Sequence, residues 1–249
     1  MTPLNGTTAV ITGAGRGLGA ALAITLADAG AQVILCARSE QALAQVAAII
    51  AKRTGQTAGQ VIVDLADNTS IKQAVANITA KYQHIDLLIN NGAMWLEASD
   101  APHSEDEIFG TINAAVTGSY LMTQSLLPLL KNSKRPDIVT IGSISGLPNA
   151  PLHSVSVPFY AAKHAQAALA SGLQQILRDT PIRSLCVHPP YLDDVSPEDA
   201  AWEQVSERQK GEQATNRDIC EAVLFAITRP RHITLSSIVV DSDSGGLFG

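Results

Sequence analysis

The sequence is poor in aromatic residues, cysteines and basic runs, and each shortage argues against a class of function. Aromatic side chains make up 4% of the 249 residues, which argues against the stacking platforms that hold nucleic-acid bases. The formal net charge is −6 at pH 7 and no basic run occurs, so we expect no nucleic-acid partner. Cys36, Cys186 and Cys220 are widely spaced in apolar stretches, which predicts buried free thiols and a reducing compartment.

Long apolar runs and targeting signals are also missing. No stretch of about twenty apolar residues occurs that could span a bilayer, so we expect no membrane partner. The N-terminal residues do not combine a basic segment with an apolar core, so we expect no signal peptide and a cytoplasmic protein. The six histidines never pair at the spacing of metal ligands, and we assign no metal.

The sequence instead has a regular alternation of strand-like and helix-like runs. The strand-like runs are rich in Val, Ile and Leu without polar alternation, which is typical of strands covered on both faces. Strands are predicted at 8–12, 32–37, 59–64, 85–90, 137–142, 183–188 and 237–241, and helices at 16–29, 40–54, 69–82, 105–130, 159–178 and 217–228. This order predicts right-handed βαβ units and a seven-stranded parallel sheet in an α/β fold.

One segment departs from this alternation. Residues 191–216 are polar, contain Pro197 and Trp202, and separate the sixth strand from the last helix. Long connections in compact domains are often lids or binding loops, so we predict a substrate lid here, with an ordinary surface excursion as the alternative. No linker, repeat or low-complexity segment occurs elsewhere, so residues 1–249 are predicted to form a single domain.

Four glycines are concentrated between the first strand and the first helix, where residues 12–19 read Thr-Gly-Ala-Gly-Arg-Gly-Leu-Gly. Glycine lets the backbone approach a ligand closely, and a helix N-terminus attracts a pyrophosphate. The flanking strand and helix favour a dinucleotide site over a tight turn without a ligand. The cofactor-binding residues expected in this turn are Gly13, Gly15, Arg16, Gly17, Leu18 and Gly19.

Arg38 directly follows the second strand, where a dinucleotide site that prefers NAD would carry an acid for the ribose 2′-hydroxyl. A guanidinium group suits a 2′-phosphate instead, and Arg16 could reach the same phosphate. We therefore predict NADP(H) as the cofactor, with two ligand-free surface arginines as the alternative. Further contacts to the cofactor are expected after the following strands, from Ser39, Asp64, Leu65, Asn91, Gly92, Ala93 and Pro189.

The fifth strand is followed by Ser143, and the next helix carries Tyr160 and Lys163. Residues 142–146 do not form the nucleophile elbow of a hydrolase, because Ile144 stands at its centre. Helix residues three apart share a face, and a nearby ammonium lowers the pKa of a phenol. Such a phenol could exchange a proton with an alcohol or carbonyl, although a solvated helix pair is the alternative.

Taken in order, these motifs resemble the short-chain dehydrogenase/reductase family over essentially the whole chain. The resemblance rests on residues 12–19, Asp64, Asn90-Asn91, Asn113, Ser143, Tyr160 and Lys163. It implies a Rossmann-like, doubly wound sheet with helices on both faces, three layers in all. It also implies a nicotinamide cofactor and hydride transfer between that cofactor and a small carbonyl or alcohol substrate.

The resemblance also implies a role for each catalytic residue. Tyr160 would be the general acid/base, and Lys163 would bind the nicotinamide ribose and lower the tyrosine pKa. Ser143 would hydrogen-bond the substrate oxygen, and Asn113 would support a proton-relay water. A homotetramer or homodimer packed through the helices at 105–130 and 159–178 is likewise implied.

The expected substrate pocket is mostly apolar, which suggests a ketone reductase with a fairly apolar substrate. Its lining residues are expected to be Ser143, Trp95, Leu147, Leu152, His153, Tyr191 and Trp202.

The chain also departs from the family pattern at several places. These are Gly92-Ala93 for Ala-Gly, Pro189-Pro190 for Pro-Gly, Asp193-Asp194 near an expected threonine, and a long segment 147–157. A second proline removes an N–H donor, and an acid beside a diphosphate is electrostatically unfavourable. These departures motivate the alternative of a catalytically impaired NADP-binding sensor or scaffold protein.

Overall fold

The computed structural model describes residues 3–152 and 154–247. Within these residues all strand pairs are parallel and the sheet order is β3-β2-β1-β4-β5-β6-β7. The strands are β1 Thr8–Thr12, β2 Gln32–Ala37, β3 Gly59–Ile62, β4 Leu87–Asn90, β5 Asp137–Ile141, β6 Arg183–His188 and β7 Ser237–Val239. The helices are α1 Gly17–Asp28, α2 Glu40–Thr54, α3 Asn68–Lys81, α4 Glu105–Ile112, η1 Asn113–Gly118, α5 Ser119–Lys131, η2 Ile144–Gly146, α6 Val157–Ile176, α7 Ala200–Gln204, η3 Val205–Glu207 and α8 Asn216–Ile227.

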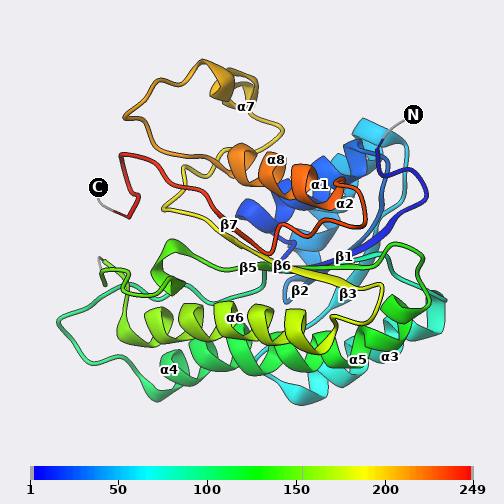
Figure 1. Cartoon of the computed structure of the whole chain (residues 1–249), viewed down its shortest axis with the longest axis horizontal. Coiled ribbons are helices and arrows are strands. Elements are labelled where there is room, and N and C mark those ends of the chain that lie inside the picture. Colours follow the sequence, from blue (N-terminus) through cyan, green and yellow to red (C-terminus); the bar gives the residue numbers. More distant parts are fainter. Residues whose placement is uncertain (1–2, 153, 248–249) are drawn as a thin grey trace.

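Helices cover both faces of the sheet, as the sequence predicts. In Figure 1, α1, α2 and α8 lie above the sheet and α3, α4, α5 and α6 lie below it. Successive residues of β1 point to opposite faces, so Ile11 joins the core cluster under α1 and α8 while Val10 joins the cluster over α3 and α5. The predicted three-layer, seven-stranded, Rossmann-like fold is therefore confirmed.

The topology predisposes one edge of the sheet to bind a ligand. Strand β1 pairs with β2 on one side and with β4 on the other. The strands that follow β1 are therefore added at one edge of the sheet up to β3 and at the opposite edge from β4 onward. In open parallel sheets this switch point leaves a crevice outside the carboxyl ends of the strands. The glycine turn 13–16 lies at that place, between β1 and α1.

The helix predicted over 105–130 is interrupted by a π-helical turn. The six residues of η1 separate α4 from α5, and α4 begins with a capping box between Ser104 and Glu107. A Cβ on Gly118 would lie 1.9 Å from the Leu65 carbonyl oxygen, so the loop after β3 packs directly on this turn. Single π turns are frequent at functional sites, and here the turn adjoins the carboxyl edge of the sheet.

Segment 191–216 contains α7 and η3 and rises beyond α8 in Figure 1. Arg208 forms an ion pair with Asp193 at 2.7 Å, and Arg217 donates a hydrogen bond to the Trp202 carbonyl at 2.6 Å. Trp202 itself is buried in the core cluster of α1 and α8. Among the described residues, no helix has both the length and the apolar character that a bilayer crossing needs.

Candidate active site

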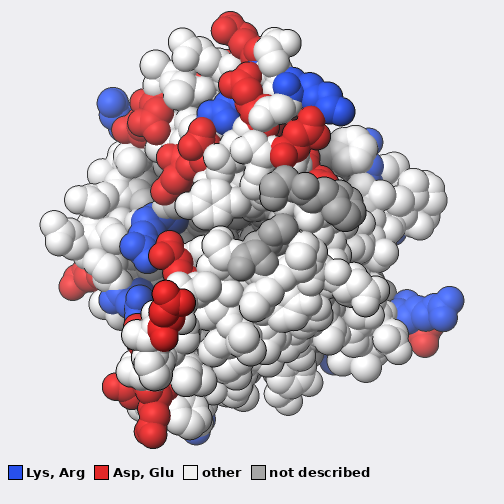
Figure 2. Space-filling model, turned by 90° about the vertical axis from the view of Figure 1, so that its left-hand side faces the viewer, with Lys and Arg blue, Asp and Glu red and all other residues white. Residues whose placement is uncertain are grey.

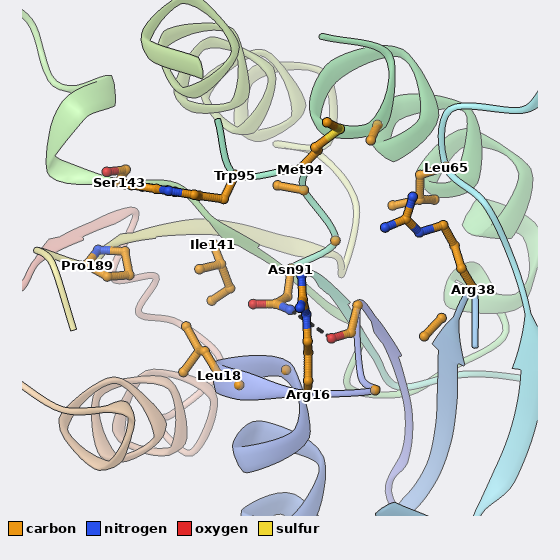
Figure 3. A pocket seen from close by; sticks show the side chains of 18 of the residues that line it. Arg16, Leu18, Arg38, Leu65, Asn91, Met94, Trp95, Ile141, Ser143 and Pro189 are labelled. Carbon is orange, nitrogen blue, oxygen red and sulfur yellow. Dashed lines mark hydrogen bonds between the residues drawn. The ribbon is translucent and has the colours of Figure 1, made fainter. Parts of the chain in front are cut away.

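A cavity of about 740 Å³ lies at the carboxyl ends of the strands. Its long dimension runs from Arg38 and Leu65 at one end to Ser143, Trp95 and Pro189 at the other (Figure 3). The loops that follow each of the strands β1 to β6 contribute lining residues. An elongated cavity with different chemistry at its two ends suits a ligand that is itself long and has two distinct ends.

The glycine turn forms the floor of the cavity. Gly13 and Gly17 have φ values of 67° and 54°, a region that side chains other than glycine rarely adopt. A Cβ on Gly13 would lie 2.9 Å from both Asn91 Nδ2 and the Gly92 Cα. Helix α1 starts at Gly17 without a side-chain cap from Arg16, so its first-turn N–H groups are available to an anion. The turn therefore fits a diphosphate.

Thr12 joins the glycine turn to the loop after β4, a role that the sequence reasoning did not assign. Its hydroxyl accepts hydrogen bonds from the backbone N–H groups of Asn91 at 3.0 Å and Gly92 at 2.9 Å. The Asn91 amide nitrogen donates to the Thr12 carbonyl at 3.2 Å. A Cβ at Gly92 would lie 2.5 Å from Leu65 Cδ1, so glycine at this position lets Leu65 pack against the loop.

Two arginines project toward the cavity from different elements. Figure 3 shows Arg38 extending over Leu65 at one end and Arg16 pointing toward Asn91 near the middle. Both arginine side chains are exposed, and no ion pair is recorded for either among the described residues. Ser39 also lines the cavity, but its hydroxyl caps α2 by accepting a hydrogen bond from the Ala42 N–H at 3.2 Å.

An acidic residue lies close to the anion site. The Asp194 carboxylate is 3.6 Å from the place where a Cβ on Gly17 would stand, and it accepts a hydrogen bond from Asn216. Both residues line the cavity beside the start of α1. Its neighbour Asp193 points elsewhere, toward Arg208. The positive end of α1 therefore shares its surroundings with one negative charge.

At the opposite end, Ser143 and Lys163 lie on the lining of the cavity. The Ser143 hydroxyl accepts a hydrogen bond from the Ser145 N–H at 3.1 Å, and the Ser143 carbonyl contacts His188 Nδ1 at 3.1 Å. Lys163 Nζ donates to the Ile141 carbonyl at 3.2 Å. Burial lowers the pKa of Lys163 to about 8, because the charged form loses water.

The residue that shares the cavity face with Lys163 is Phe159, not Tyr160. Phe159 lines the cavity, and Lys163 Nζ lies 5.5 Å from the centre of its ring. Tyr160 is absent from the described lining, and its hydroxyl donates to the Ala150 carbonyl at 2.7 Å. Residues four apart on a helix share a face as closely as residues three apart, and packing selects the former here. The expected pairing of Tyr160 with Lys163 in the cavity is thereby corrected.

Other predicted residues divide between the cavity and its surroundings. Asn113, Leu147, Leu152 and Trp202 are not among the described lining residues, and His153 lies outside the residues that the structure describes. Asn113 belongs to η1. Trp202 packs in the core against residues that are distant in sequence, so the local sequence pattern did not predict its burial. The predicted residues that do line the cavity are Gly13, Gly15, Arg16, Gly17, Leu18, Gly19, Arg38, Ser39, Asp64, Leu65, Asn91, Gly92, Ala93, Trp95, Ser143, Lys163, Pro189 and Tyr191.

Aromatic side chains surround the Ser143 end. Trp95 meets Phe159 edge-on with ring centres 4.7 Å apart, and it meets Tyr191 at 6.2 Å. Residues Leu96 and Ala98 hydrogen-bond with Ser156 and Ser154, which places Trp95 beside the start of α6. Phe159 and Met94 are lining residues that the sequence reasoning missed. Counting one helical turn back from Lys163 would have pointed to Phe159.

Known proteins are similar to this chain over most of its length. A family model described as short chain dehydrogenase matches residues 7–204. An uncharacterized oxidoreductase of Staphylococcus saprophyticus is 28% identical over 240 residues, which cover 96% of this chain and 99% of that protein.

Solved structures are similar too. A metagenomic short-chain oxidoreductase in complex with NADP has a TM-score of 0.79 at 25% identity, over 96% of this chain and 97% of the other. A short-chain type dehydrogenase/reductase from Mycobacterium marinum has a TM-score of 0.80 at 25% identity, over 96% and 94%. The chain belongs to the short-chain dehydrogenase family of oxidoreductases.

Proposed function

We propose that this protein binds NADP(H) in the cavity and transfers a hydride between the nicotinamide and a carbonyl or alcohol. The observation that carries the proposal is the elongated cavity, which has Arg38 at one end, Arg16 near the middle, and Ser143 with Lys163 at the other end. The metagenomic relative crystallised in complex with NADP adds support for the phosphorylated cofactor.

Each part of the cavity has a role in this proposal. Arg38 and Arg16 bind the 2′-phosphate, because a planar guanidinium fork can donate two parallel hydrogen bonds to a pair of phosphate oxygens. The free N–H groups at the start of α1 bind the diphosphate. Lys163 binds the nicotinamide ribose, and the Ser143 hydroxyl hydrogen-bonds the substrate oxygen. When bound, the nicotinamide supplies the hydride that adds to the carbonyl carbon.

The proposed substrate is a fairly apolar ketone, and reduction is the proposed direction. Trp95, Phe159 and Tyr191 surround the Ser143 end, and their rings would contact an apolar group. On the face drawn in Figure 2, charged side chains gather along the upper and left margins and at one place on the right margin, and the lower centre of the face is largely uncharged. Such surroundings favour an uncharged substrate over a carboxylate or a phosphate ester.

The cofactor preference is tested with the wild-type protein and Arg38→Ala. We expect wild type to bind NADPH at least tenfold more tightly than NADH, measured by nicotinamide fluorescence. Arg38→Ala should weaken NADPH binding by about 10- to 100-fold, which matches the loss of a charge-assisted hydrogen bond of about 1.5–3 kcal/mol, and leave NADH binding unchanged. An unchanged preference in Arg38→Ala would refute the role of Arg38.

A second candidate, an NADP(H)-binding sensor or scaffold without turnover, is favoured by one observation. Phe159 stands where a proton donor would face the cavity beside Lys163. NADPH consumption with acetophenone and cyclohexanone, followed by absorbance, separates the two candidates. Tight NADPH binding without consumption over hours would favour the sensor, and slow consumption would favour the oxidoreductase.

We also propose a homodimer or homotetramer that packs through α4, α5 and α6. Phe109 on α4, Tyr120 on α5 and Ile176 on α6 are large and exposed. Exposed apolar groups on neighbouring helices are common at subunit interfaces. Sedimentation equilibrium should give a mass that is a multiple of the chain mass, and a monomer would contradict the proposal.

A further inference from the structure

We propose that position 159 is the proton-transfer position of this cavity, and that its phenylalanine limits the rate of carbonyl reduction. The inference rests on the proposed hydride transfer with NADP(H). It assigns the limiting step to one side chain, and it implies that Phe159→Tyr converts a slow carbonyl reductase into a faster one.

The place of Phe159 follows from how α6 begins. Ser156 caps the helix by accepting a hydrogen bond from the Phe159 N–H at 3.2 Å, which fixes where the first turn begins. Phe159 is 5% exposed and Lys163, one turn later, is 6% exposed. Both line the cavity, and the lysine Nζ lies 5.5 Å from the phenyl centre. A phenol at this position would therefore stand next to an ammonium group.

Tyr160 is committed to a different contact. Its hydroxyl donates to the Ala150 carbonyl at 2.7 Å, and its ring stacks at a tilt on His164 with centres 4.3 Å apart. Ala150 follows Asn149, whose φ of 62° marks a tight turn in the long segment between η2 and α6. The Tyr160 hydroxyl therefore anchors this segment to α6, and its proton is already directed at a carbonyl.

Carbonyl reduction needs a proton as well as a hydride. The carbonyl carbon takes the hydride, the C=O π bond breaks, and the oxygen takes a proton to give the alcohol. A phenyl ring has no proton to give, so the oxygen must take its proton from water or from the Lys163 ammonium, which solvent then reprotonates. A positioned general acid contributes about 10²- to 10⁴-fold to such a step, so its absence makes reduction slow.

The test compares wild type with Phe159→Tyr, Phe159→Leu and Tyr160→Phe. NADPH affinity is measured first by fluorescence, and the rate of NADPH oxidation is then followed with acetophenone and cyclohexanone. We expect Phe159→Tyr to raise kcat by at least tenfold, and Phe159→Leu to bring no gain. Tyr160→Phe should change kcat by less than about twofold, since its hydroxyl donates to the Ala150 carbonyl in the segment before α6.

A second readout does not depend on turnover. The ultraviolet difference titration of Phe159→Tyr against wild type reports one added phenol. We expect this phenol to ionise at a lower pH than in Phe159→Tyr combined with Lys163→Met, because the ammonium favours the phenolate. Circular dichroism of each variant checks that it folds.

The outcomes separate this inference from the proposed function. Failure of wild type to bind NADPH would overturn the proposed function itself. If NADPH binds but Tyr160→Phe abolishes turnover, position 160 is the donor and the inference is wrong. It is also wrong if the added phenol ionises at the same pH with and without Lys163, since position 159 would then not face the ammonium.

Discussion

The fold buries the charged ammonium group of Lys163, which is energetically unfavourable. Its side chain is buried and its ammonium group has one recorded hydrogen bond, to the Ile141 carbonyl. An ammonium group prefers several water contacts, so burial lowers its pKa to about 8. The ribose hydroxyls of the proposed cofactor would supply the missing acceptors. The buried charge of Lys163 therefore destabilises the free protein, and it would stabilise the complex with the proposed cofactor.

This cost predicts how the stability of the free protein depends on pH. The pKa of Lys163 falls from 10.5 in the unfolded chain to about 8 in the folded state. Between these pH values the unfolded chain binds more protons, so the free energy of unfolding rises with pH. Between pH 7 and pH 10.5, we expect the free energy of unfolding of wild type to rise by up to about 3 kcal/mol relative to that of Lys163→Met. Urea unfolding of both proteins at both pH values measures this change. A difference in the free energy of unfolding between the two proteins that does not vary with pH would contradict the prediction.

Among the elements, β5, β6 and the end of α8 are joined by one buried charge cluster. Asp137 and Arg183 stand side by side at the starts of β5 and β6 and form a bidentate pair at 2.8 and 2.7 Å. Arg183 also donates to the carbonyl of Ile227 at the end of α8 and to the carbonyl of Ile233 beyond it. Arg231 makes a second contact with Asp137 at 2.6 Å. The cluster thus fixes the segment that leads into β7.

Asp137→Asn should therefore destabilise the protein strongly. The substitution leaves two arginines beside a neutral amide, with Arg183 buried, and breaking a buried pair in this way costs about 3–5 kcal/mol. We expect the melting temperature to fall by on the order of 10 °C. Asp28→Asn is the matched control, because it breaks the more exposed pair with Arg53 and should cost less than about 1 kcal/mol. Equal losses in the two variants would show that burial is not the cause.

The elements also show what the sequence could and could not predict. The bounds predicted for β1, β2, β6 and α2 agree with the structure, because apolar runs bounded by turn residues are local signals. The π turn η1 ends at Gly118, which packs closely against Leu65, a residue far away in sequence. The hydrophobic periodicity of residues 105–130 could not have predicted that contact.

The candidate site was predictable to the same degree. The glycine turn and Arg38 follow strands directly, so their place at the cavity could be read from the order of the motifs. The face of α6 could not, because spacings of three and four residues both fit one side of a helix. Packing against η2 decides the phase, since a Cβ on Gly146 would lie 2.5 Å from the Lys163 carbonyl oxygen. Trp202 was misplaced for a similar reason, since its burial depends on α1 and α8.

At the scale of the whole molecule, the cavity belongs to no single element. Six strand ends, those of β1 to β6, and the N-terminus of α1 contribute to it, so a ligand bound there contacts both halves of the sheet. The chain carries a net charge of −6, and Asp194 adds a negative charge at the anion site. Binding of an anionic dinucleotide must therefore rely on the local positive groups of the cavity rather than on the overall charge.

NADPH should consequently stabilise the whole fold, and more strongly than NADH. A ligand at about one hundred times its dissociation constant adds about 2.7 kcal/mol to the free energy of unfolding. For a chain of this length that corresponds to a rise in melting temperature of about 5–10 °C. NADH at the same concentration should give a smaller rise, because it lacks the 2′-phosphate that the two arginines are proposed to bind. Differential scanning calorimetry with increasing cofactor measures both shifts, and raising the salt concentration should reduce the difference between them, since exposed charges are screened. Equal shifts for NADPH and NADH would count against the arginine site while leaving dinucleotide binding intact, and no shift with either would count against the cavity as a cofactor site.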